Sequence, residues 1–240
     1  QYKRYFRLTQ HGEDVELPED KVTKEIFNLV DSDKETISRK VSIILDHFTS
    51  KTVKTIGGRG RGMVVVRSRY HCVLFFHEMK RQMKERGLHF SCLTGFSGTI
   101  KYGGREVTET ILNTENGLKP KVSIPDGLKD PHYRILIVSN KFQTGYDEPL
   151  LQSMYVDKKL GGVQCVQTLS RLNRTKTGKT ETFVLDFVND PEKVVKSFED
   201  YYESTYLEGE TDPNKLYDLQ TKIRGFYLIQ KNDIDEFVIE

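Results

Sequence analysis

The sequence predicts an α/β fold in which a parallel sheet is flanked by helices, with a helical segment at each end of the chain. Short apolar, β-branched runs recur without polar alternation, and helical stretches separate them, which is typical of parallel strands buried on both faces. The chain has 240 residues, of which 36% are hydrophobic and 30% are charged, so it can bury a core of its own. The predicted strands are residues 63–66, 90–93, 135–138, 154–156 and 183–188.

Residues 1–50 form a predicted helical lead-in segment. Its apolar residues recur at i, i+4, i+7, i+8 and i+11, which places one stripe on one helix face and predicts core packing. The stripe consists of Ile37, Val41, Ile44, Leu45 and Phe48. Ser32 or Asp33 is available as the cap near the start of this helix.

Residues 51–190 are the predicted main domain, which opens with the glycine-rich loop 57–62. A phosphate-binding loop follows a strand and opens a helix, whereas these glycines precede the strand 63–66. We therefore interpret the loop as flexible and basic. A helix over residues 70–86 and the later strands continue the alternation.

Residues 191–240 read as an acidic helical extension. Aromatic and aliphatic residues recur at helical spacing, which favours packing over a ligand site. These residues are Phe198, Tyr201, Tyr202, Tyr206, Leu216, Leu219, Ile223 and Phe226.

Composition excludes several classes of protein. No apolar run approaches the length of a membrane span, and the first residues lack the pattern of a secretory signal. Cys72, Cys92 and Cys165 are widely spaced, without the paired spacing of a zinc or redox motif, so no metal site is predicted. We expect reduced core thiols in a cytoplasmic protein. The absence of an initial Met is consistent with a fragment of a longer protein.

The net charge of +2 hides an asymmetry along the chain. Residues 51–110 carry 12 Lys and Arg against 4 Asp and Glu, whereas residues 181–240 carry 6 against 15. The basic part is suited to a phosphate backbone. The alternative, that these cations only solvate helix faces, is equally compatible with the sequence.

Polar residues follow the predicted strands, and in a parallel sheet such residues gather at one edge. The loops concerned are 67–69, 94–98, 139–147 and 157–159. Arg67 and Arg69 are suited to phosphate contacts, and Ser97 and Thr144 can donate hydroxyl hydrogen bonds. The alternative is that the hydroxyl groups cap the following helices.

Two later segments give a more specific signal. In the loop 139–147, Gly145 permits a close approach, and Asp147 can accept hydrogen bonds from a ribose hydroxyl or a partner arginine. On a helix, Gln167, Arg171 and Arg174 would share one face at i, i+4 and i+7. No carboxylate occurs between Asp157 and Glu181, so we expect these arginines to need an external anion.

These motifs resemble a known family. The sequence Gln-x-x-Ser-Arg-x-x-Arg at 167–174, after Thr-Gly-x-Asp at 144–147 and a strand ending in Arg-Ser-Arg at 67–69, is similar to the second RecA-like domain of superfamily 2 helicases and translocases. The amino-acid sequence of this chain from residue 145 to 188 looks most like the motor subunit of type I restriction enzymes. The match is specific from about residue 63 to 190 and looser on both flanks.

The resemblance implies a role for each matched position. Arg171 and Arg174 would be arginine fingers, with Gln167 as a supporting contact. Gly145 and Asp147 would belong to the nucleotide-facing loop. The implied DNA-facing residues are Arg67, Ser68, Arg69, Ser97 and Thr144.

The resemblance also implies partners that this chain lacks. ATP and Mg²⁺ would be bound mainly by a first RecA-like domain of the same protein, because the chain contains neither a phosphate loop nor an acidic magnesium motif. Gly178-Lys-Thr180 is a false match, since Asn173 stands where the first glycine is required. Duplex DNA and the modification and specificity subunits of a restriction complex are the other implied partners.

The sequence thus predicts the second motor domain of an ATP-dependent DNA translocase from a type I restriction endonuclease, inactive by itself. Two alternatives remain open: a domain of another superfamily 2 helicase or remodeller acting on DNA or RNA, and a non-catalytic nucleic-acid-binding α/β module.

Overall fold

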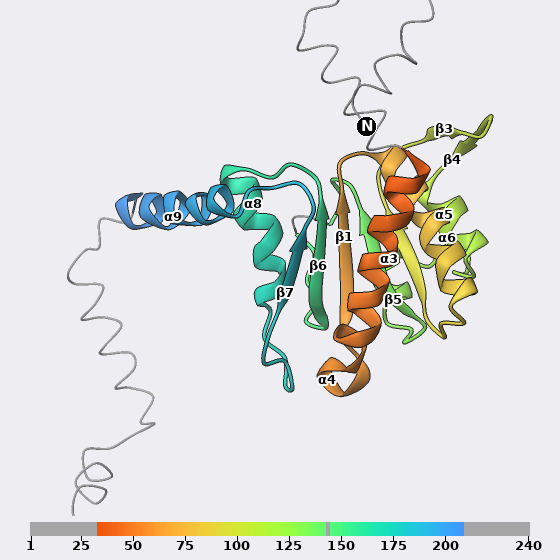
Figure 1. The fold of residues 1–240 in the computed structure, drawn as a ribbon, viewed down its shortest axis with the longest axis horizontal. Coiled ribbons are helices and arrows are strands. Elements are labelled where there is room, and N and C mark those ends of the chain that lie inside the picture. The colour runs from red at the N-terminus through yellow and green to blue at the C-terminus, as the bar shows by residue number, and fades with distance from the viewer. Residues whose placement is uncertain (1–32, 143–144, 209–240) are drawn as a thin grey trace, which may run out of the picture.

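The computed structural model describes residues 33–142 and 145–208, and within these ranges five parallel strands form one sheet (Figure 1). The strand order is β2-β5-β1-β6-β7. The strands are β1 (Arg61–Val66), β2 (Ser91–Gly95), β5 (Tyr133–Val138), β6 (Leu151–Asp157) and β7 (Phe183–Asp186). Each predicted strand overlaps an observed one. The predicted fold class, a parallel sheet flanked by helices, is confirmed.

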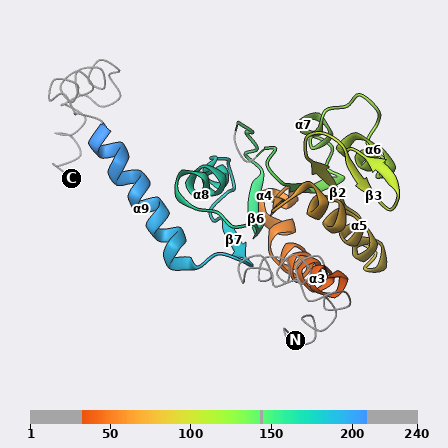
Figure 2. The ribbon, with the colours of Figure 1, turned by 90° about the horizontal axis from the view of Figure 1, so that it is seen from above.

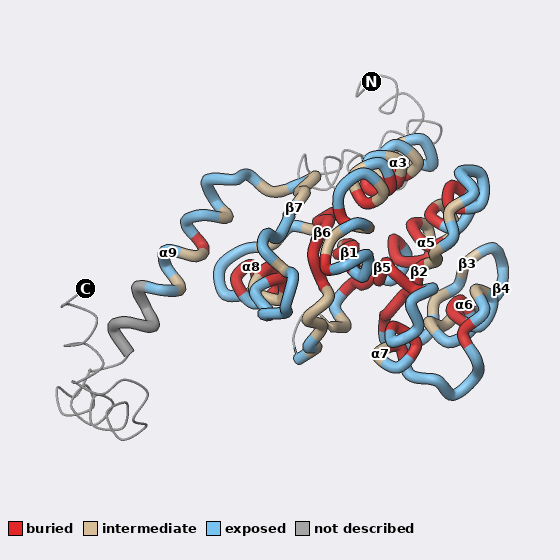
Figure 3. Tube along the Cα trace, turned by 90° about the horizontal axis from the view of Figure 1, so that it is seen from below, coloured by how far each residue is buried: buried red, intermediate tan, exposed pale blue. Residues whose placement is uncertain are grey.

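Helices cover both faces of the sheet (Figure 2). One face packs against α3 (Lys34–Ser50) and α5 (Arg69–Glu85), and the other against α7 (Ile124–Gly127) and α8 (Gly162–Leu169). Side chains of β1 alternate accordingly, because Val64 joins the first cluster and Val65 the second. Both are fully buried, and each such burial contributes about 1.5–3 kcal/mol. Figure 3 shows the resulting buried centre.

The predicted lead-in helix is present as α3. Its five stripe residues, Ile37, Val41, Ile44, Leu45 and Phe48, are all buried in the core of the first face. The Asp33 carboxylate accepts hydrogen bonds from the backbone N–H groups of Glu35 and Thr36, so Asp33 is the N-cap. A cap of this kind contributes about 1 kcal/mol. The end of the lead-in segment at residue 50 remains a prediction, although α3 packs in the same core as the sheet.

Short elements complete the connections between strands. A 3₁₀ turn η1 (Thr52–Lys54) and the turn α4 (Thr55–Gly58) precede β1. Between β2 and β5 lie a two-stranded hairpin, β3 (Ile100–Tyr102) with β4 (Arg105–Val107), and helix α6 (Glu109–Glu115). The 57–62 glycine loop leads into the N-terminal end of β1, so it lies at the opposite end of that strand from Arg67.

Helix α9 (Pro191–Glu208) extends away from the sheet beyond α8 (Figure 1). Val194 and Phe198 pack against the core of the second face, whereas Tyr202 is exposed. The aromatic stripe therefore packs on the domain in its first part. The Tyr206 side chain and the predicted residues Leu216, Leu219, Ile223 and Phe226 lie outside the described part of the structure.

The three cysteines are free and buried, as predicted. Within the described ranges, no helix combines the length and the apolar character needed to cross a membrane.

Candidate functional site

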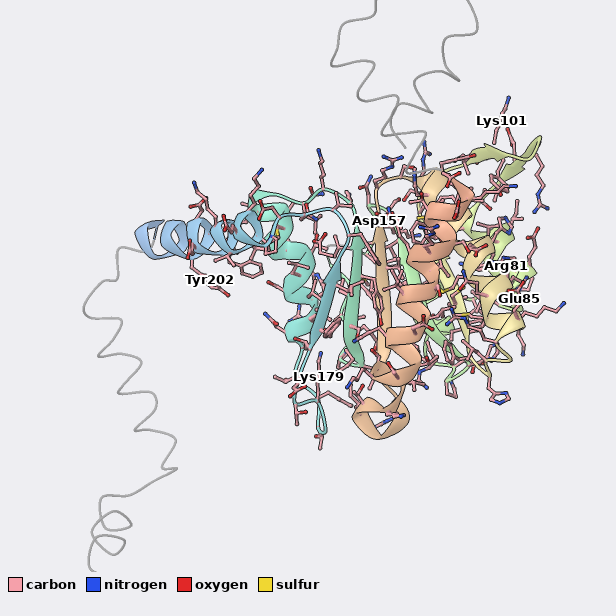
Figure 4. All side chains as sticks on the ribbon, viewed as in Figure 1. Arg81, Glu85, Lys101, Asp157, Lys179 and Tyr202 are labelled. Carbon is pink, nitrogen blue, oxygen red and sulfur yellow. The ribbon has the colours of Figure 1, made fainter. Side chains whose placement is uncertain are left out.

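The loops that follow β1, β2, β5 and β6 meet at the C-terminal edge of the sheet. The strand register brings Val66 opposite Asp157 and aligns Val138 with both Val65 and Gly95. Figure 4 labels Asp157 at this upper edge and Lys179 at the lower one. The prediction that residues after the strands gather at one edge is confirmed for these four strand ends.

Side chains link these loops across intervening strands. The Arg69 guanidinium donates to the Ser97 carbonyl oxygen at 3.3 Å and so reaches across the end of β5. Lys158 Nζ donates to Asn140 Oδ1 at 2.7 Å and so reaches across the end of β1. Burial lowers the pKa of Lys158. The edge is thus a connected set of cationic and polar groups.

Arg67 and Ser68 are fixed by the start of α5. Ser68 is the N-cap of that helix, because its hydroxyl accepts the His71 backbone N–H at 3.3 Å. Arg67 Nε donates to His71 Nε2 at 3.0 Å. The capping interpretation therefore holds for Ser68, although its hydroxyl still lies beside Arg67. Thr144, the fifth predicted DNA-facing residue, lies outside the described residues.

Two carboxylates at this edge are paired with lysines of the domain, Glu109 with Lys141 and Asp157 with Lys40. Asp157 is buried, and Lys40 of α3 contacts its Oδ1 at 2.6 Å. The lead-in helix therefore supplies a cation to the end of β6, which leaves the edge with a basic balance among its described side chains.

The second half of the loop 139–147 lies elsewhere than predicted. Glu148 forms an ion pair with Arg61, the first residue of β1, and the Arg61 N–H donates to the Leu150 carbonyl at 2.8 Å. The segment therefore crosses from the C-terminal to the N-terminal edge, because β6 runs parallel to β5 and must start at the opposite end. The prediction that Tyr146 and Asp147 line the C-terminal edge is wrong.

The helical spacing expected for the arginine segment is also wrong. Helix α8 ends at Leu169, the chain continues as the 3₁₀ turn η2 (Ser170–Asn173), and Arg174 is extended with ψ 125°. Lys179 Nζ donates to the carbonyl oxygens of Leu172 at 2.6 Å and Arg174 at 2.9 Å. These bonds satisfy carbonyl groups at the end of the helical segment and replace a further helical turn.

Both arginines nevertheless converge on one short segment. Arg174 Nε lies 3.1 Å from Asp147 Oδ1, with side chains 49% and 66% exposed. Arg171 NH1 donates to the Tyr146 carbonyl oxygen at 3.3 Å. The inference that Arg174 needs an external anion is therefore corrected, because Asp147 is a carboxylate partner within the chain. A search for acids between residues 157 and 181 could not find it.

The remaining predicted nucleotide-facing residues are Gly145 and Gln167. Gly145 adopts a φ of 72°, which glycine tolerates best, directly before Tyr146. Gln167 is exposed on α8, and the described hydrogen bonds do not join it to either arginine. The neighbouring loop 172–182 encloses an open concavity of about 570 Å³ that includes Arg174 and Lys179. Burial lowers the pKa of Lys179, while Glu148 opposes that shift.

The Gly178-Lys-Thr180 segment lacks the context of a phosphate loop, as predicted. Gly178 has a φ of 83°, and strand β7, not a helix, follows it. Sequence reasoning missed Lys179 itself, which holds the backbone of the arginine segment. Among residues 33–142 and 145–208, the structure contains no group of three His, Cys, Asp or Glu side chains able to hold a metal ion.

Comparison with known proteins supports the resemblance that the motifs indicate. Residues 102–189 match the model for type I restriction enzyme subunit R domain 3. The chain is 27% identical over 163 residues to a type I restriction enzyme endonuclease subunit of Staphylococcus aureus, covering 58% of this chain and 18% of that protein. It is 26% identical over 153 residues to the HindI endonuclease subunit of Haemophilus influenzae, covering 60% and 14%. The chain thus spans less than a fifth of these relatives, and its predicted resemblance to type I restriction enzyme R subunits is confirmed.

Solved structures give a looser likeness. The C-terminal domain of the DEAD-box protein Dbp5 is similar with a TM-score of 0.39 and 12% identity, covering 68% of this chain and 78% of that one.

Proposed function

We propose that this chain is the second RecA-like domain of an ATP-dependent DNA translocase motor in a type I restriction endonuclease. The observation that carries the proposal is the convergence of Arg171 and Arg174 on Tyr146–Asp147. Both segments lie within residues 102–189, which match the R subunit family model. Two motifs separated in sequence therefore form one surface at one edge of the sheet.

At this edge, Arg171 and Arg174 would stabilise the negative charge that develops on a transferring γ-phosphate. An arginine finger of this kind contributes on the order of 10³–10⁵ in rate. The Arg174–Asp147 pair is exposed, so it orients the guanidinium while contributing only about 0–1 kcal/mol to stability. A bound phosphate can replace or join the carboxylate at little energetic cost. Gln167 would support the contact, and Gly145 would let the backbone approach the nucleotide.

The described residues fit ATP as the second half of a shared site. The exposed guanidinium of Arg174 is suited to the anionic phosphate chain. ATP with Mg²⁺ would supply the phosphoryl group and its charge-neutralising cation, both held mainly by the first RecA-like domain. This chain would contribute the arginines and would hydrolyse no ATP by itself.

The opposite edge of the sheet would form part of the DNA track. Arg67, Ser68, Arg69 and Ser97 lie there among the linked loops, and Thr144 completes the predicted set. Cations, hydroxyl groups and backbone amides are the groups that contact phosphodiesters without reading sequence. Strand β1 begins at one edge with Arg61, which pairs with Glu148, and ends at the other edge directly before Arg67, so one strand connects the two surfaces.

The proposed partners are duplex DNA, the first RecA-like domain, and the modification and specificity subunits of a restriction complex. A cytoplasmic location belongs to the same proposal. The similarity of this chain to the endonuclease subunits of type I restriction enzymes supports both the proposed partners and the proposed location.

The test is DNA-stimulated ATP hydrolysis by the complete protein that contains both motor domains. Arg171→Ala and Arg174→Ala should each lower the rate at saturating ATP by at least about a hundredfold. Arg39→Ala is the matched control, because Arg39 is an exposed arginine paired with Glu35 on α3. Undiminished hydrolysis in both finger variants would overturn the proposal. Stimulation by RNA in place of duplex DNA would favour another superfamily 2 helicase.

A further inference from the structure

His71 contacts both predicted DNA-facing residues that precede α5. Its ring Nε2 receives a hydrogen bond from Arg67 Nε at 3.0 Å, and its Nδ1 lies 2.8 Å from Ser68 Oγ. Its backbone N–H also donates to Ser68 Oγ at 3.3 Å. The residue is only 4% exposed, so burial holds the ring in place.

The chemistry of arginine determines the protonation of this ring. Arg67 Nε carries a hydrogen and can only donate, so His71 Nε2 must be the acceptor and the imidazole must be neutral. The ring hydrogen is then on Nδ1, which donates to Ser68 Oγ. One histidine therefore accepts from Arg67 and donates to Ser68.

Both neighbours are oriented as a result. The Ser68 Oγ accepts hydrogen bonds from the backbone N–H and from the ring Nδ1 of His71. These two bonds occupy both lone pairs of the Ser68 oxygen and leave its hydroxyl hydrogen unused. That hydrogen can be donated to a ligand. The bond at Nε fixes the plane of the Arg67 guanidinium, whose terminal nitrogens are the groups that bind a phosphate bidentately.

We propose that His71 is a positioning residue that presents Arg67 and Ser68 together to one backbone phosphate of DNA. The proposal rests on the proposed function of the C-terminal edge as part of the DNA track. It extends that function by a buried residue that the sequence motifs do not include. His71 touches no nucleic acid and acts through its two neighbours.

The experiment measures the affinity of the complete protein for a duplex oligonucleotide, without nucleotide, over a series of salt concentrations. His71→Phe removes both ring hydrogen bonds and should weaken binding about tenfold, on the scale of a lost hydrogen bond to a charged group. It should also reduce the slope of the logarithm of the binding constant against the logarithm of the salt concentration by about one, which corresponds to one lost phosphate contact. A variant that is only less stable would keep the slope.

His77→Phe is the matched control on the same helix. His77 is half-buried and stacks on Tyr102, with ring centroids 5.3 Å apart, and its Nε2 has no hydrogen-bond partner among the described residues. This control should bind DNA as the wild-type protein does. Weakening equal to that of His71→Phe would overturn the proposal, because any change of a helix histidine would then have the same effect.

Two conservative variants separate the two contacts. His71→Gln places an acceptor near the Nε2 position and should restore the contribution of Arg67. His71→Asn places a donor near the Nδ1 position and should restore that of Ser68. If neither variant binds better than His71→Phe, the positioning role is wrong.

A double-mutant cycle separates failure of this inference from failure of the proposed DNA track. In an Arg67→Ala, Ser68→Ala background, His71→Phe should cause no further loss, because its effect passes through those residues. A full additional loss would overturn the inference. Wild-type binding by His71→Phe with weakened Arg67→Ala would overturn the inference alone. Wild-type binding by Arg67→Ala and Ser68→Ala would overturn the DNA track as well.

Discussion

Arg174 and Asp147 form an ion pair, with Nε and Oδ1 3.1 Å apart, that joins the end of the arginine segment to the loop before β6. Both side chains are largely exposed, so water and salt screen the pair. The contact is therefore suited to orienting a guanidinium for a ligand and contributes little to folding.

Replacement of Asp147 should separate these two roles. Asp147→Asn should change the free energy of unfolding by less than about 1 kcal/mol, because exposed pairs contribute little. In the complete protein it should still lower DNA-stimulated ATP hydrolysis, on the order of tenfold, because Arg174 loses its orienting partner. Chemical denaturation and steady-state hydrolysis measure the two effects. A large loss of stability with normal ATP hydrolysis would show instead that Asp147 serves folding and does not orient Arg174 for a ligand.

The buried ion pair at the same edge should behave in the opposite way. Arg61 and Glu148 are only 10% and 12% exposed, so Glu148→Ala leaves a buried guanidinium without its carboxylate. We expect about 3 kcal/mol of destabilisation in a urea titration. Glu85→Ala serves as the comparison, because its pair with Arg81 is exposed, and it should cost less than about 1 kcal/mol. Equal costs for the two variants would contradict the structure.

Acid should weaken the ion pair between Glu78 and Arg81 within α5. Hydrogen bonds from Arg81 lower the pKa of Glu78 from 4.5 to about 2. A carboxylate whose pKa is lower in the folded state stabilises that state at any pH above its pKa in the unfolded state. This contribution is lost as the pH falls from 4.5 to about 2. The difference in unfolding free energy between wild type and Glu78→Gln should therefore shrink across this window. A difference independent of pH would be the contrary result.

The cysteines should be unreactive in the folded chain. Burial raises the pKa of Cys72 and of Cys92 to about 12, and it also raises that of Cys165, so thiolate is scarce at neutral pH. Iodoacetamide should label none of the three under native conditions and all three in guanidinium chloride, as measured by mass spectrometry. Rapid native labelling of Cys72 or Cys92 would show that the core is open.

Periodicity in the sequence predicted the parts of the fold that packing alone determines. The α3 stripe from Ile37 to Phe48 is buried as predicted, because a 3.6-residue repeat leaves one face to cover the sheet. Strands β1, β5 and β6 were found because burial on both faces demands continuous apolar runs, whereas β7 is an apolar run at an exposed edge of the sheet. The β3–β4 hairpin was missed, since three-residue strands carry no readable pattern.

Contacts between distant segments were not predictable in the same way. The backbone at the end of η2 is held by Lys179, which donates to the carbonyl groups of Leu172 and Arg174 from a loop that the sequence motifs did not include. The partner of Arg174 lies in a loop whose course across the sheet follows from the order of strands, not from local spacing. Motif residues could thus be named from sequence, whereas their geometry required the fold.

The most direct test of the central claim compares Arg174→Ala with Arg39→Ala in the complete protein with saturating duplex DNA. The measurement is single-turnover ATP hydrolysis together with ATP affinity, which separates chemistry from binding. We predict that Arg174→Ala lowers the hydrolysis rate at least about a hundredfold, with a much smaller change in ATP affinity, while Arg39→Ala retains the wild-type rate. Wild-type hydrolysis by Arg174→Ala would contradict the assignment of this edge to the ATP site.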